Sequence, residues 1–429
     1  MKNILVFPCG SEIGLDIYSS VKYSTHFHLI GANSIDDHGV FVYDDYIPGL
    51  PFVSDPLFIP ALRQIVLDRK IDAIYPTMDS VISTLKAHEK DLGCMVISSP
   101  AETTMICLSK SRTYQSLRDT LRVPEQYQPD RVTKFPVFVK PDEGYGSRGV
   151  ALVNDSTALQ QVLSANPKLL ILEYLPGKEY TVDCFTDRKG KLLYAAARER
   201  NRIKGGISVN TSFSEEQEEF IELAQKINQK IIFRGAWFYQ VKRAADKGLC
   251  LMEIASRLGG SSLLSRAVGV NLALMTLFDA FNIDVSVQKN NSYRVELDRA
   301  LDSRYHCDNL NYDYVYVDFD DCLITHKTSV NTELVRFLYE CLNKEKRVIL
   351  LTKHIGDLKA DLDRFRLNQL FDEIILIRSN QEKTDFINYT NAIFIDDSFT
   401  EREKVKKAFG IPVFGPEMAD LLSDSIQSS

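Results

Sequence analysis

Three carboxylates follow a strand-like run in the stretch YVDFDDCLI. The run Tyr314–Val317 consists of aromatic and β-branched residues, which is the composition of a buried strand. Asp318, Asp320 and Asp321 then stand where that strand should end. Carboxylates this close together repel one another unless a positive charge lies among them. The spacing therefore indicates either a catalytic site that binds a metal ion or a polar strand end that is only solvated.

Two later strand-like runs also end in polar residues. Val348–Leu351 is followed by Thr352, and Ala392–Ile395 is followed by Asp396 and Asp397. Because the carboxyl ends of parallel strands share one edge of a sheet, we expect these groups to meet there. Together with a lysine they would supply a nucleophile, a phosphate-binding hydroxyl, a cation and oxygen ligands of the kind that Mg²⁺ prefers.

In this order the motifs resemble those of the haloacid dehalogenase (HAD) phosphatase superfamily, over about the last 120 residues of the chain. The resemblance implies that Asp318 attacks phosphorus, and that Asp320 protonates the leaving group and then activates water. It also implies that Thr352 and Lys383 hold the phosphoryl oxygens. The Mg²⁺ ligands that it implies are Asp318, Asp320, Asp396 and Asp397.

The cation of this predicted site has three candidates. Lys383, in the stretch RSNQEKTD, stands at the family's position, but Lys353 and Lys359 also lie near the site in the sequence. A helix and a strand use most of the chain between Asp318 and Thr352, so no sizeable cap domain is expected. An open site suits a substrate that is large or is presented by another domain.

A glycine-rich stretch, FPVFVKPDEGYGSRGV, indicates a second functional site. Lys140 follows the end of a predicted strand at Phe138–Val139. The glycines would let backbone N–H groups approach phosphates without clashes from Cβ atoms, although such a loop is also a common structural turn. The residues of this predicted phosphate loop are Gly144, Gly146, Ser147 and Gly149.

Two stretches further along the chain contain residues that could act together with this loop. LILEYLPGKEYTVD predicts a strand followed by Glu173, a short turn and Glu179. WFYQVKRAADKGLCLMEIASRLGG predicts a β-hairpin that places Gln240 and Glu253 on one surface, with Arg257 just beyond it.

This order of motifs resembles the ATP-grasp ligases, and within them the carbamoyl-phosphate-synthase-like branch, over about residues 1–305. The resemblance implies that Gln240 and Glu253 bind Mg²⁺, which bridges the phosphate oxygens of ATP. It implies that Arg257 lies against the transferred phosphoryl group or the acceptor carboxylate. The remaining contacts that it implies are Lys110 and Lys140 at the phosphates, Glu173, Tyr174 and Leu175 at the adenine, and Glu179 at the ribose.

One position departs from these relatives. They often read Glu-x-Asn-Pro-Arg, whereas this chain has an alanine, Ala255, between Glu253 and Arg257. The Ala255 side chain cannot ligate a metal, so the number of Mg²⁺ ions, one or two, stays open. A water molecule could fill the missing position, because Mg²⁺ readily keeps water ligands.

A basic stretch, RERNRIKGG, lies between these motifs. If it is extended, Arg198, Arg200, Arg202 and Lys204 alternate onto one face and would attract an anionic substrate or the γ-phosphate of ATP. A solvated basic loop explains Arg202 and Lys204 equally well. The family position favours a function for Arg198 and Arg200, and Arg200 is a candidate catalytic residue. Asp79, which follows another predicted strand, could face the acceptor substrate.

Composition limits the class of protein. The chain has 429 residues, of which 45% are hydrophobic and 25% charged, as in soluble globular proteins of two or three domains. Its net charge of −7 argues against nucleic acid or an anionic membrane as the main partner. No apolar run reaches the length of a membrane span. Eight scattered cysteines without a C-x-x-C pair indicate reduced, buried thiols and a cytoplasmic protein.

Alternating strand and helix patterns predict an α/β fold class, with an α+β part in the ATP-grasp region. We expect a Rossmann-like pre-ATP-grasp domain at residues 1–105, an ATP-grasp domain at 106–309 and a HAD Rossmannoid domain without a large cap at 310–429. Polar clusters at Asn290–Asn291 and His306–Asn311 place the last boundary near Leu310.

Together the two resemblances predict a bifunctional enzyme that uses ATP and Mg²⁺. An ADP-forming ligase would join a small carboxylate to an amine through an acyl phosphate, and a phosphatase would hydrolyse a phosphomonoester. One ligase substrate could carry the phosphate that the phosphatase later removes. Two alternatives stay open: an ATP-binding regulatory module that has lost its ligase chemistry, which Ala255 favours, or two activities with unrelated substrates.

Overall fold

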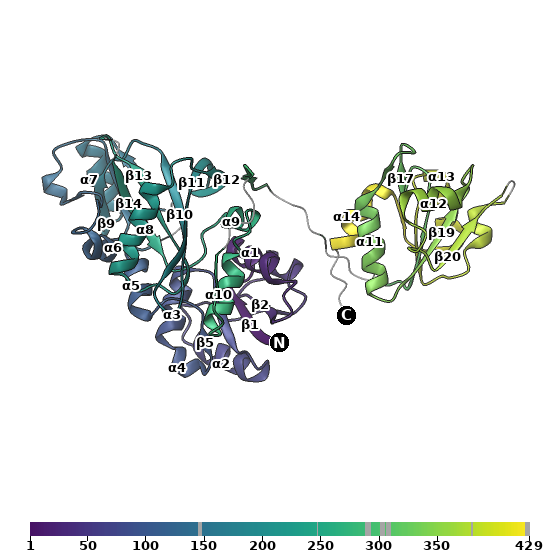
Figure 1. Ribbon diagram of the computed structural model, residues 1–429, viewed down its shortest axis with the longest axis horizontal. Coiled ribbons are helices and arrows are strands. Elements are labelled where there is room, and N and C mark those ends of the chain that lie inside the picture. Colours follow the sequence, from purple (N-terminus) through teal and green to yellow (C-terminus); the bar gives the residue numbers. More distant parts are fainter. Residues whose placement is uncertain are drawn as a thin grey trace. The chain divides into compact units, whose positions relative to one another are not determined.

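The computed structural model describes residues 1–144, 148–246, 248–287, 293–300, 305, 310–378 and 381–424 (Figure 1). Contacts divide the chain into two compact units, Met1–Leu301 and Asp302–Ser429. Gly146 and Ser147 of the predicted phosphate loop lie outside the described residues, as do Asn290–Asn291 and most of the second polar cluster.

A parallel sheet begins the first unit, with the strand order β3-β2-β1-β4-β5. Its strands are β1 (Lys2–Phe7), β2 (Phe27–Ala32), β3 (Tyr46–Ile47), β4 (Ala73–Pro76) and β5 (Met95–Val96). The helices between them are α1 (Glu12–Val21), η1 (His38–Phe41), α2 (Phe58–Asp68), α3 (Asp79–Ala87) and α4 (Glu89–Leu92). The strand order reverses beside β1, so the carboxyl ends of β1 and β4 flank a crevice of the kind in which ligands bind. The hydroxyls of Ser11 and Thr77, which follow these two strands, hydrogen-bond at 2.8 Å.

An antiparallel sheet with the order β6-β9-β7-β8 follows. Its strands are β6 (Gln126–Tyr127), β7 (Val137–Pro141), β8 (Ala151–Val153) and β9 (Leu169–Glu173). The helices of this region are α5 (Ala101–Leu108), α6 (Lys110–Leu117), η2 (Pro129–Arg131) and α7 (Ser156–Ala165). Lys140 lies within β7 and not after the strand, because β7 keeps pairing with β9 as far as Pro141.

A larger antiparallel sheet, in the order β14-β13-β10-β11-β12-β15, completes the first unit. Its strands are β10 (Glu179–Thr186), β11 (Leu192–Lys204), β12 (Ile207–Phe213), β13 (Gly235–Arg243), β14 (Leu249–Ala255) and β15 (Glu296–Asp298). Its helices are α8 (Glu218–Lys230), α9 (Leu263–Ala267) and α10 (Leu272–Ala280). The apolar face of α8, with Phe220, Ala224 and Ile227 at helical spacing, packs into one core with Trp237. Trp237 is therefore a core residue.

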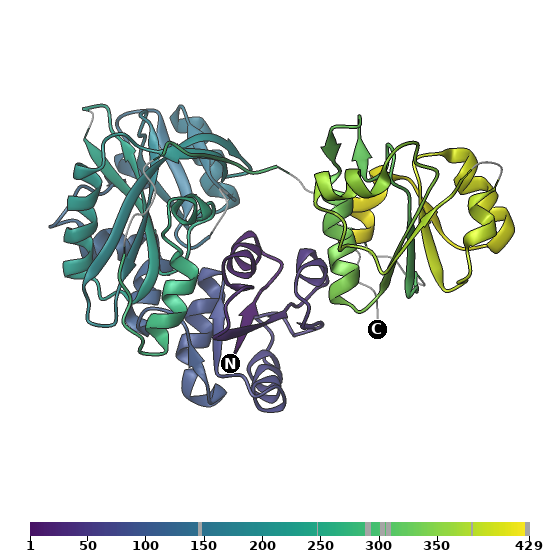
Figure 2. The same cartoon turned by 45° about the vertical axis from the view of Figure 1, so that its right-hand side comes forward.

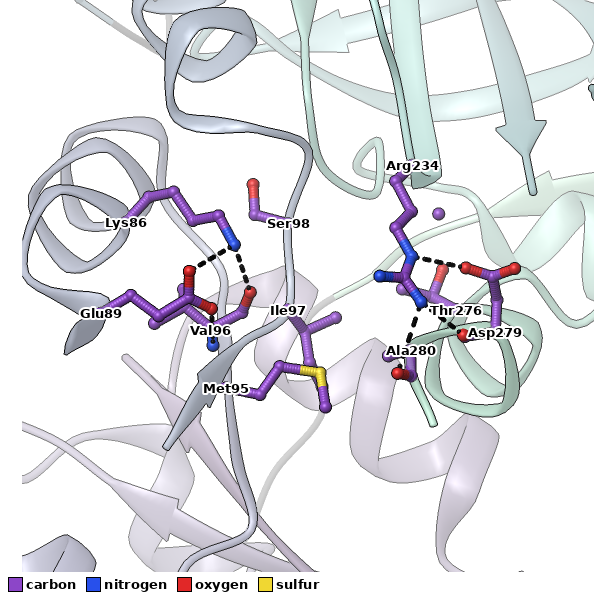
Figure 3. Close-up of a pocket in the computed structure, with 11 residues that line it drawn as sticks. Lys86, Glu89, Met95, Val96, Ile97, Ser98, Arg234, Thr276, Asp279 and Ala280 are labelled. Carbon is purple, nitrogen blue, oxygen red and sulfur yellow. Dashed lines mark hydrogen bonds and ion pairs between the residues drawn. The ribbon is translucent and has the colours of Figure 1, made fainter. Parts of the chain in front are cut away.

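A polar hollow of about 290 Å³ lies between the edge strand β5 and the strand β13 (Figure 3). Arg234 donates to the Asp279 carboxylate at 2.9 Å, and Lys86 pairs with Glu89 at 2.8 Å. The Ser99 hydroxyl also accepts a hydrogen bond from the Arg234 backbone N–H at 3.1 Å. The charges on each side of this hollow are thus paired with one another, and the Ser99–Arg234 hydrogen bond joins the two sides.

The second unit is built on a parallel sheet with the order β20-β19-β16-β21-β22. Its strands are β16 (Tyr314–Val317), β19 (Arg347–Thr352), β20 (Glu373–Leu376), β21 (Ala392–Ile395) and β22 (Val413–Phe414). A hairpin of β17 (Ile324–Thr325) and β18 (Ser329–Val330) follows β16. The helices are α11 (Thr332–Asn343), α12 (Leu358–Phe365), η3 (Lys383–Phe386), α13 (Phe399–Phe409), η4 (Pro416–Met418) and α14 (Ala419–Asp424).

This sheet is covered on both faces, as Figures 1 and 2 show. Val315 and Val317 of β16 pack into one core with α11, whereas Tyr316 packs into the other with Val405 of α13. The sequence pattern predicted three strands here, and the structure adds the short edge strands β20 and β22. Across the described residues of both units, no helix is both long and apolar enough to span a membrane. The described cysteines are unpaired and most are buried, as expected.

Candidate active sites

A cleft of about 540 Å³ opens in the first unit, between the first sheet and the six-stranded sheet. Ser11, Thr77 and Asp79 reach it from the carboxyl ends of β1 and β4. Gln240, Glu253 and Arg257 reach it from the hairpin β13–β14 and the turn after it. The other sequence-predicted residues that line it are Lys110, Gly144, Arg198 and Arg200.

Gln240 and Glu253 lie directly opposite each other across β13 and β14. Both side chains face the cleft, so the prediction that the hairpin brings them onto one surface is correct. An amide oxygen beside a carboxylate is a donor set that suits Mg²⁺. Ala255, two residues beyond Glu253, lines the same cleft and offers no ligand atom.

Two lysines lie beside the predicted phosphate loop. Lys110 Nζ donates to the backbone oxygens of Asp142 and Gly144 at 3.2 and 3.4 Å. Lys140 is buried, and its Nζ donates to the backbone oxygen of Met252 at 3.1 Å. Burial lowers the pKa of Lys140 to about 8, although the nearby Glu253 carboxylate opposes this shift. An anion at the loop would therefore favour the charged form of Lys140.

The predicted adenine and ribose residues do not line this cleft in the described structure. Glu173 ends β9, where its carboxylate accepts from the Arg122 guanidinium at 3.4 Å. Tyr174 is exposed and Leu175 is buried against Cys250. Glu179, expected at the ribose, instead pairs with Arg200.

Arg257 is held by a carboxylate from a distant part of the chain. Its Nε and Nη2 donate to the two oxygens of Asp79 at 3.0 and 2.7 Å, and its guanidinium lies 5.2 Å from the ring centre of Phe238. Burial alone would lower the pKa of Arg257, but the Asp79 carboxylate raises it above its ordinary value. Asp79 is the first residue of α3, directly after β4. The sequence placed Asp79 near the acceptor but did not predict this pair.

The expected row of four cations on one face of β11 is interrupted. Irregular pairing after Arg200 and again after Arg202 breaks the alternation along the strand. Arg198 pairs with Asp183 at 2.8 Å, Arg200 pairs with Glu179, and Arg202 pairs with Asp298. A buried guanidinium needs such a counter-charge, because transfer of an unpaired ion out of water is very unfavourable. Three of the four cations are thus each paired with a carboxylate, and the attraction of an anionic substrate stays a prediction.

The sequence-predicted groups of the second unit meet at the carboxyl edge of its sheet. Lys383 Nζ lies 2.6 Å from Asp318 Oδ1 and 2.6 Å from Asp396 Oδ2, and all three side chains are buried. Lys353 instead pairs with Glu401 at 3.2 Å and is partly exposed. Among the three lysine candidates, the geometry thus selects Lys383.

The carboxylates around Lys383 carry more negative charge than this one lysine can balance. Burial raises the pKa of Asp318 to about 6, Lys383 lowers it and Asp396 raises it further. Oxygen atoms of Asp318, Asp396 and Asp397 lie within 4.8 Å of one another. Oxygen ligands at this spacing fit a divalent cation such as Mg²⁺. Thr352 Oγ1 is buried next to Asp318 without a hydrogen bond of normal geometry.

Asp320 was predicted both as the acid–base residue and as a metal ligand. Its carboxylate is not part of the three-carboxylate group, and His354 Nδ1 lies 2.9 Å from its Oδ2. His354 Nε2 lies 3.1 Å from the Asp361 carboxylate without the geometry of a hydrogen bond, so the imidazole lies between two acids. Sequence reasoning missed His354, although it follows Thr352 by only two residues. The positions of Asp320 and His354 fit proton transfer better than metal binding.

Comparison with known proteins identifies the fold of the first unit. Residues 165–300 match the family model described as "ATP-grasp in the biosynthetic pathway with Ter operon". The D-alanine–D-alanine ligase of Thermotoga petrophila is 26% identical over 141 residues, which cover 30% of this chain and 46% of the ligase. The chain thus spans less than half of the length of that relative.

Solved structures agree with this assignment. A biotin carboxylase–βγ-ATP complex from Campylobacter jejuni is similar over 67% of this chain and 72% of its own, with 17% identity and a TM-score of 0.57. An L-amino acid ligase from Bacillus licheniformis is similar over 65% of this chain and 74% of its own, with 16% identity and a TM-score of 0.54. About two-thirds of this chain therefore has an ATP-grasp fold, and the first unit contains an ATP-grasp domain.

Proposed function

We propose that the first unit is a carboxylate–amine ligase that consumes ATP and releases ADP. The observation that carries this proposal is the pair Gln240 and Glu253, which face each other in the cleft close to Arg257. Similarity to proteins named D-alanine–D-alanine ligase and L-amino acid ligase supports the amide-forming class.

Each group in the cleft has a role in this reaction. Gln240 and Glu253 would hold Mg²⁺, with water in place of a ligand at Ala255. When bound, the ion neutralises charge on the phosphate oxygens of ATP. Lys110 and Lys140 would bind the phosphates from the side of the predicted phosphate loop.

The reaction has two balanced steps. A carboxylate oxygen of the first substrate attacks the γ-phosphorus of ATP, so that ADP leaves and an acyl phosphate forms. The amine then attacks the acyl carbon, phosphate leaves, the amine loses a proton and an amide forms. Arg257, already oriented by Asp79, would stabilise negative charge on the transferred phosphoryl group without reorganisation. The cleft keeps the acyl phosphate next to the amine and away from water.

The direct test is a screen of pooled carboxylates and amines for ADP formation by the full chain. Steady ADP release that requires both an acid and an amine is the expected result. ADP release that needs neither, or no release with any pair, would favour the alternative of an ATP-binding regulatory module without ligase chemistry.

We infer a second activity, hydrolysis of a phosphomonoester, for residues 310–424. The carrying observation is the placement of Lys383 between the buried carboxylates of Asp318 and Asp396. This is the arrangement expected from the HAD resemblance. Its elements supply one nucleophile, one cation and a group of oxygen ligands at one sheet edge.

In that reaction Asp318 attacks phosphorus while Asp320 gives a proton to the departing alcohol. Asp320 then takes a proton from water, which attacks the aspartyl phosphate and releases phosphate. Lys383 and Thr352 would hold the phosphoryl oxygens, and His354 would orient Asp320. Asp318, Asp396 and Asp397 would hold Mg²⁺, which offsets charge on the phosphoryl group. Release of phosphate from p-nitrophenyl phosphate, lost on chelation with EDTA, tests this activity.

A further inference from the structure

Two large apolar side chains are exposed at the carboxyl edge of the sheet in the second unit. Ile355 comes three residues after Thr352, the last residue of β19, and its exposed fraction is 97%. Phe399 comes three residues after Asp396, which follows β21, and its exposed fraction is 71%. Single exposed apolar residues are ordinary on a protein surface. These two differ because each closely follows a group proposed to act on the phosphate.

The strand order places the two segments on opposite sides of the proposed nucleophile. β16, which ends just before Asp318, pairs with β19 on one side and with β21 on the other. Neighbouring strands lie about 4.8 Å apart, so β19 and β21 are about 10 Å apart across β16. In an in-line displacement the leaving group departs opposite the nucleophile. The organic part of a phosphate ester bound at Asp318 would therefore emerge between the segments that bear Ile355 and Phe399.

The exposure of Ile355 results from the way its neighbours pack. The His354 ring is buried and lies edge-on to the ring of Phe319, with ring centres 5.2 Å apart. Gly356 has a φ of +142°, and a Cβ atom there would lie 3.2 Å from His354 Nε2. Glycine therefore allows a tight turn against the imidazole. With His354 turned inward and the chain turning at Gly356, the Ile355 side chain is left in solvent.

Phe399 is positioned by the start of a helix. It is the first residue of α13, after the N-cap Ser398, whose backbone N–H donates to Asp396 Oδ1 at 2.8 Å. The Phe399 ring centre lies 6.0 Å from the Arg402 guanidinium, whose Nη1 donates to the backbone oxygen of Asp397 at 2.9 Å. The ring thus lies beside groups that contact the two aspartates proposed to bind Mg²⁺.

Two lysines near this edge are already paired with carboxylates. Lys353 lies 3.2 Å from the Glu401 carboxylate, and Lys404 lies 2.8 Å from the Glu382 carboxylate. These partly exposed pairs add little net charge with which to recognise an ionic group on a substrate. Recognition of the organic part of a substrate would then depend on the two apolar side chains.

We propose that Ile355 and Phe399 select phosphomonoesters whose organic part is apolar, such as an alkyl chain or an aryl ring, over esters of small polar alcohols. The proposal rests on the phosphatase activity inferred above and adds its substrate class. Contact with both side chains removes apolar surface of the substrate from water, in the substrate complex and in the transition state alike. The preference should therefore appear in KM and in kcat/KM more than in kcat.

Hydrolysis of n-hexyl phosphate and of ethyl phosphate by the full chain with Mg²⁺ tests the proposal. Both leaving groups are primary alkoxides of similar basicity, so a difference in kcat/KM reports contacts with the additional methylene groups. We expect the wild-type chain to prefer hexyl phosphate by about tenfold or more in kcat/KM. In the double variant Ile355→Ser with Phe399→Ser, the preference should fall to about twofold or less, because few apolar contacts remain.

Ile374→Ser is the matched control. Ile374 is also an exposed isoleucine of this unit, but it lies within the edge strand β20 and not beyond a catalytic strand end. The control should keep the wild-type preference for hexyl phosphate. Since Ile355 and Phe399 are exposed, replacing them removes little buried contact, and circular dichroism would check that the double variant is folded.

Two results would overturn the proposal: equal kcat/KM values for the two esters in the wild-type chain, or an unchanged preference in the double variant. A different result separates this proposal from the activity on which it rests. If the wild-type chain hydrolyses neither alkyl ester nor p-nitrophenyl phosphate, the phosphatase activity itself fails, and the proposed substrate class fails with it.

Discussion

The Arg257 guanidinium lies 2.7 and 3.0 Å from the two carboxylate oxygens of Asp79, although 178 residues separate the two positions. Asp79 begins α3 at the carboxyl edge of the first sheet, whereas Arg257 follows the last long strand of the ATP-grasp region. The pair therefore joins the two sides of the cleft, and the proposed phosphoryl contact depends on both.

Asp79→Asn should reduce kcat for ADP formation by about tenfold to a hundredfold, because a charged, two-pronged hydrogen bond is lost. Asp79→Glu should recover part of this loss, since it restores the carboxylate. The KM for ATP should change much less than kcat in both variants. Glu89→Gln, which removes the Lys86 ion pair outside the cleft, is the control and should leave both constants unchanged. Identical kcat values for Asp79→Asn and the wild type would show that Arg257 needs no such positioning.

Glu253→Gln should abolish ADP formation, whereas Gln240→Ala should only weaken it. An ionised carboxylate gives Mg²⁺ a charge as well as an oxygen, and an amide gives only a dipole. Because Ala255 supplies no ligand atom, the loss cannot be shared by a neighbouring side chain. Circular dichroism would check that both variants are folded. Wild-type turnover by Glu253→Gln would remove Glu253 from the metal site.

Asp318→Asn should eliminate hydrolysis of p-nitrophenyl phosphate while nucleotide binding by the first unit persists. Asparagine keeps the size of the side chain but is not a nucleophile. The same variant tests a link between the two activities. When it is given ATP, acids and amines with and without phosphate groups, mass spectrometry would detect any phosphorylated amide. Its accumulation in the variant alone would show that both sites act in one sequence, and its absence would indicate separate substrates.

His354→Ala should slow hydrolysis of alkyl phosphates more than hydrolysis of p-nitrophenyl phosphate. An alkoxide is a poor leaving group and needs the proton from Asp320, whereas p-nitrophenolate leaves readily without one. Asp361→Asn, which alters only the far side of the imidazole, should have a smaller effect. An equal loss with both substrates would mean that His354 does not act through Asp320.

Asp16 on α1 should make the stability of the first unit depend on pH. Burial raises its pKa to about 6, against the opposing effect of Arg299, and its Oδ2 has no partner among the described residues. Above pH 6 the carboxyl is ionised in both the folded and unfolded states, so the folded state bears the full burial penalty. Below about pH 4 it is protonated in both states, so the penalty disappears. The free energy of unfolding should therefore rise as the pH falls from 6 towards 4.

Asp16→Asn should raise the free energy of unfolding at pH 7 by about 3 kcal/mol or less, and this gain should shrink towards pH 4. Urea unfolding followed by Trp237 fluorescence measures it, because the single tryptophan lies in this unit. Asp68→Asn, on an exposed position of α2, serves as the control. A gain that does not vary with pH would place its origin in a contact other than the ionised Asp16.

Features encoded by local order were predictable from the sequence. The register that sets Gln240 against Glu253 follows from one hairpin, and the meeting of Asp318 with Asp396 follows from the edge of one parallel sheet. The pairing of Asp79 with Arg257 could not be predicted in this way, because Asp79 begins α3 after the first sheet and Arg257 follows a strand of another sheet. Asp183 and Glu179 lie on β10, which forms a hairpin with β11, and they were missed because the basic stretch was considered without the strand before it. The edge strand β22 was missed because two residues carry too little periodicity.

The arginine–carboxylate pairs also constrain how this chain can diverge. A change at Arg198 alone leaves the buried Asp183 without a counter-charge, and a change at Asp183 alone leaves the arginine without one. Substitutions at the two positions should therefore arise together among homologues, with both partners kept or both replaced. The same reasoning covers Glu179 with Arg200. Correlated substitutions at these positions among homologues would thus reflect the charge pairing in the cleft.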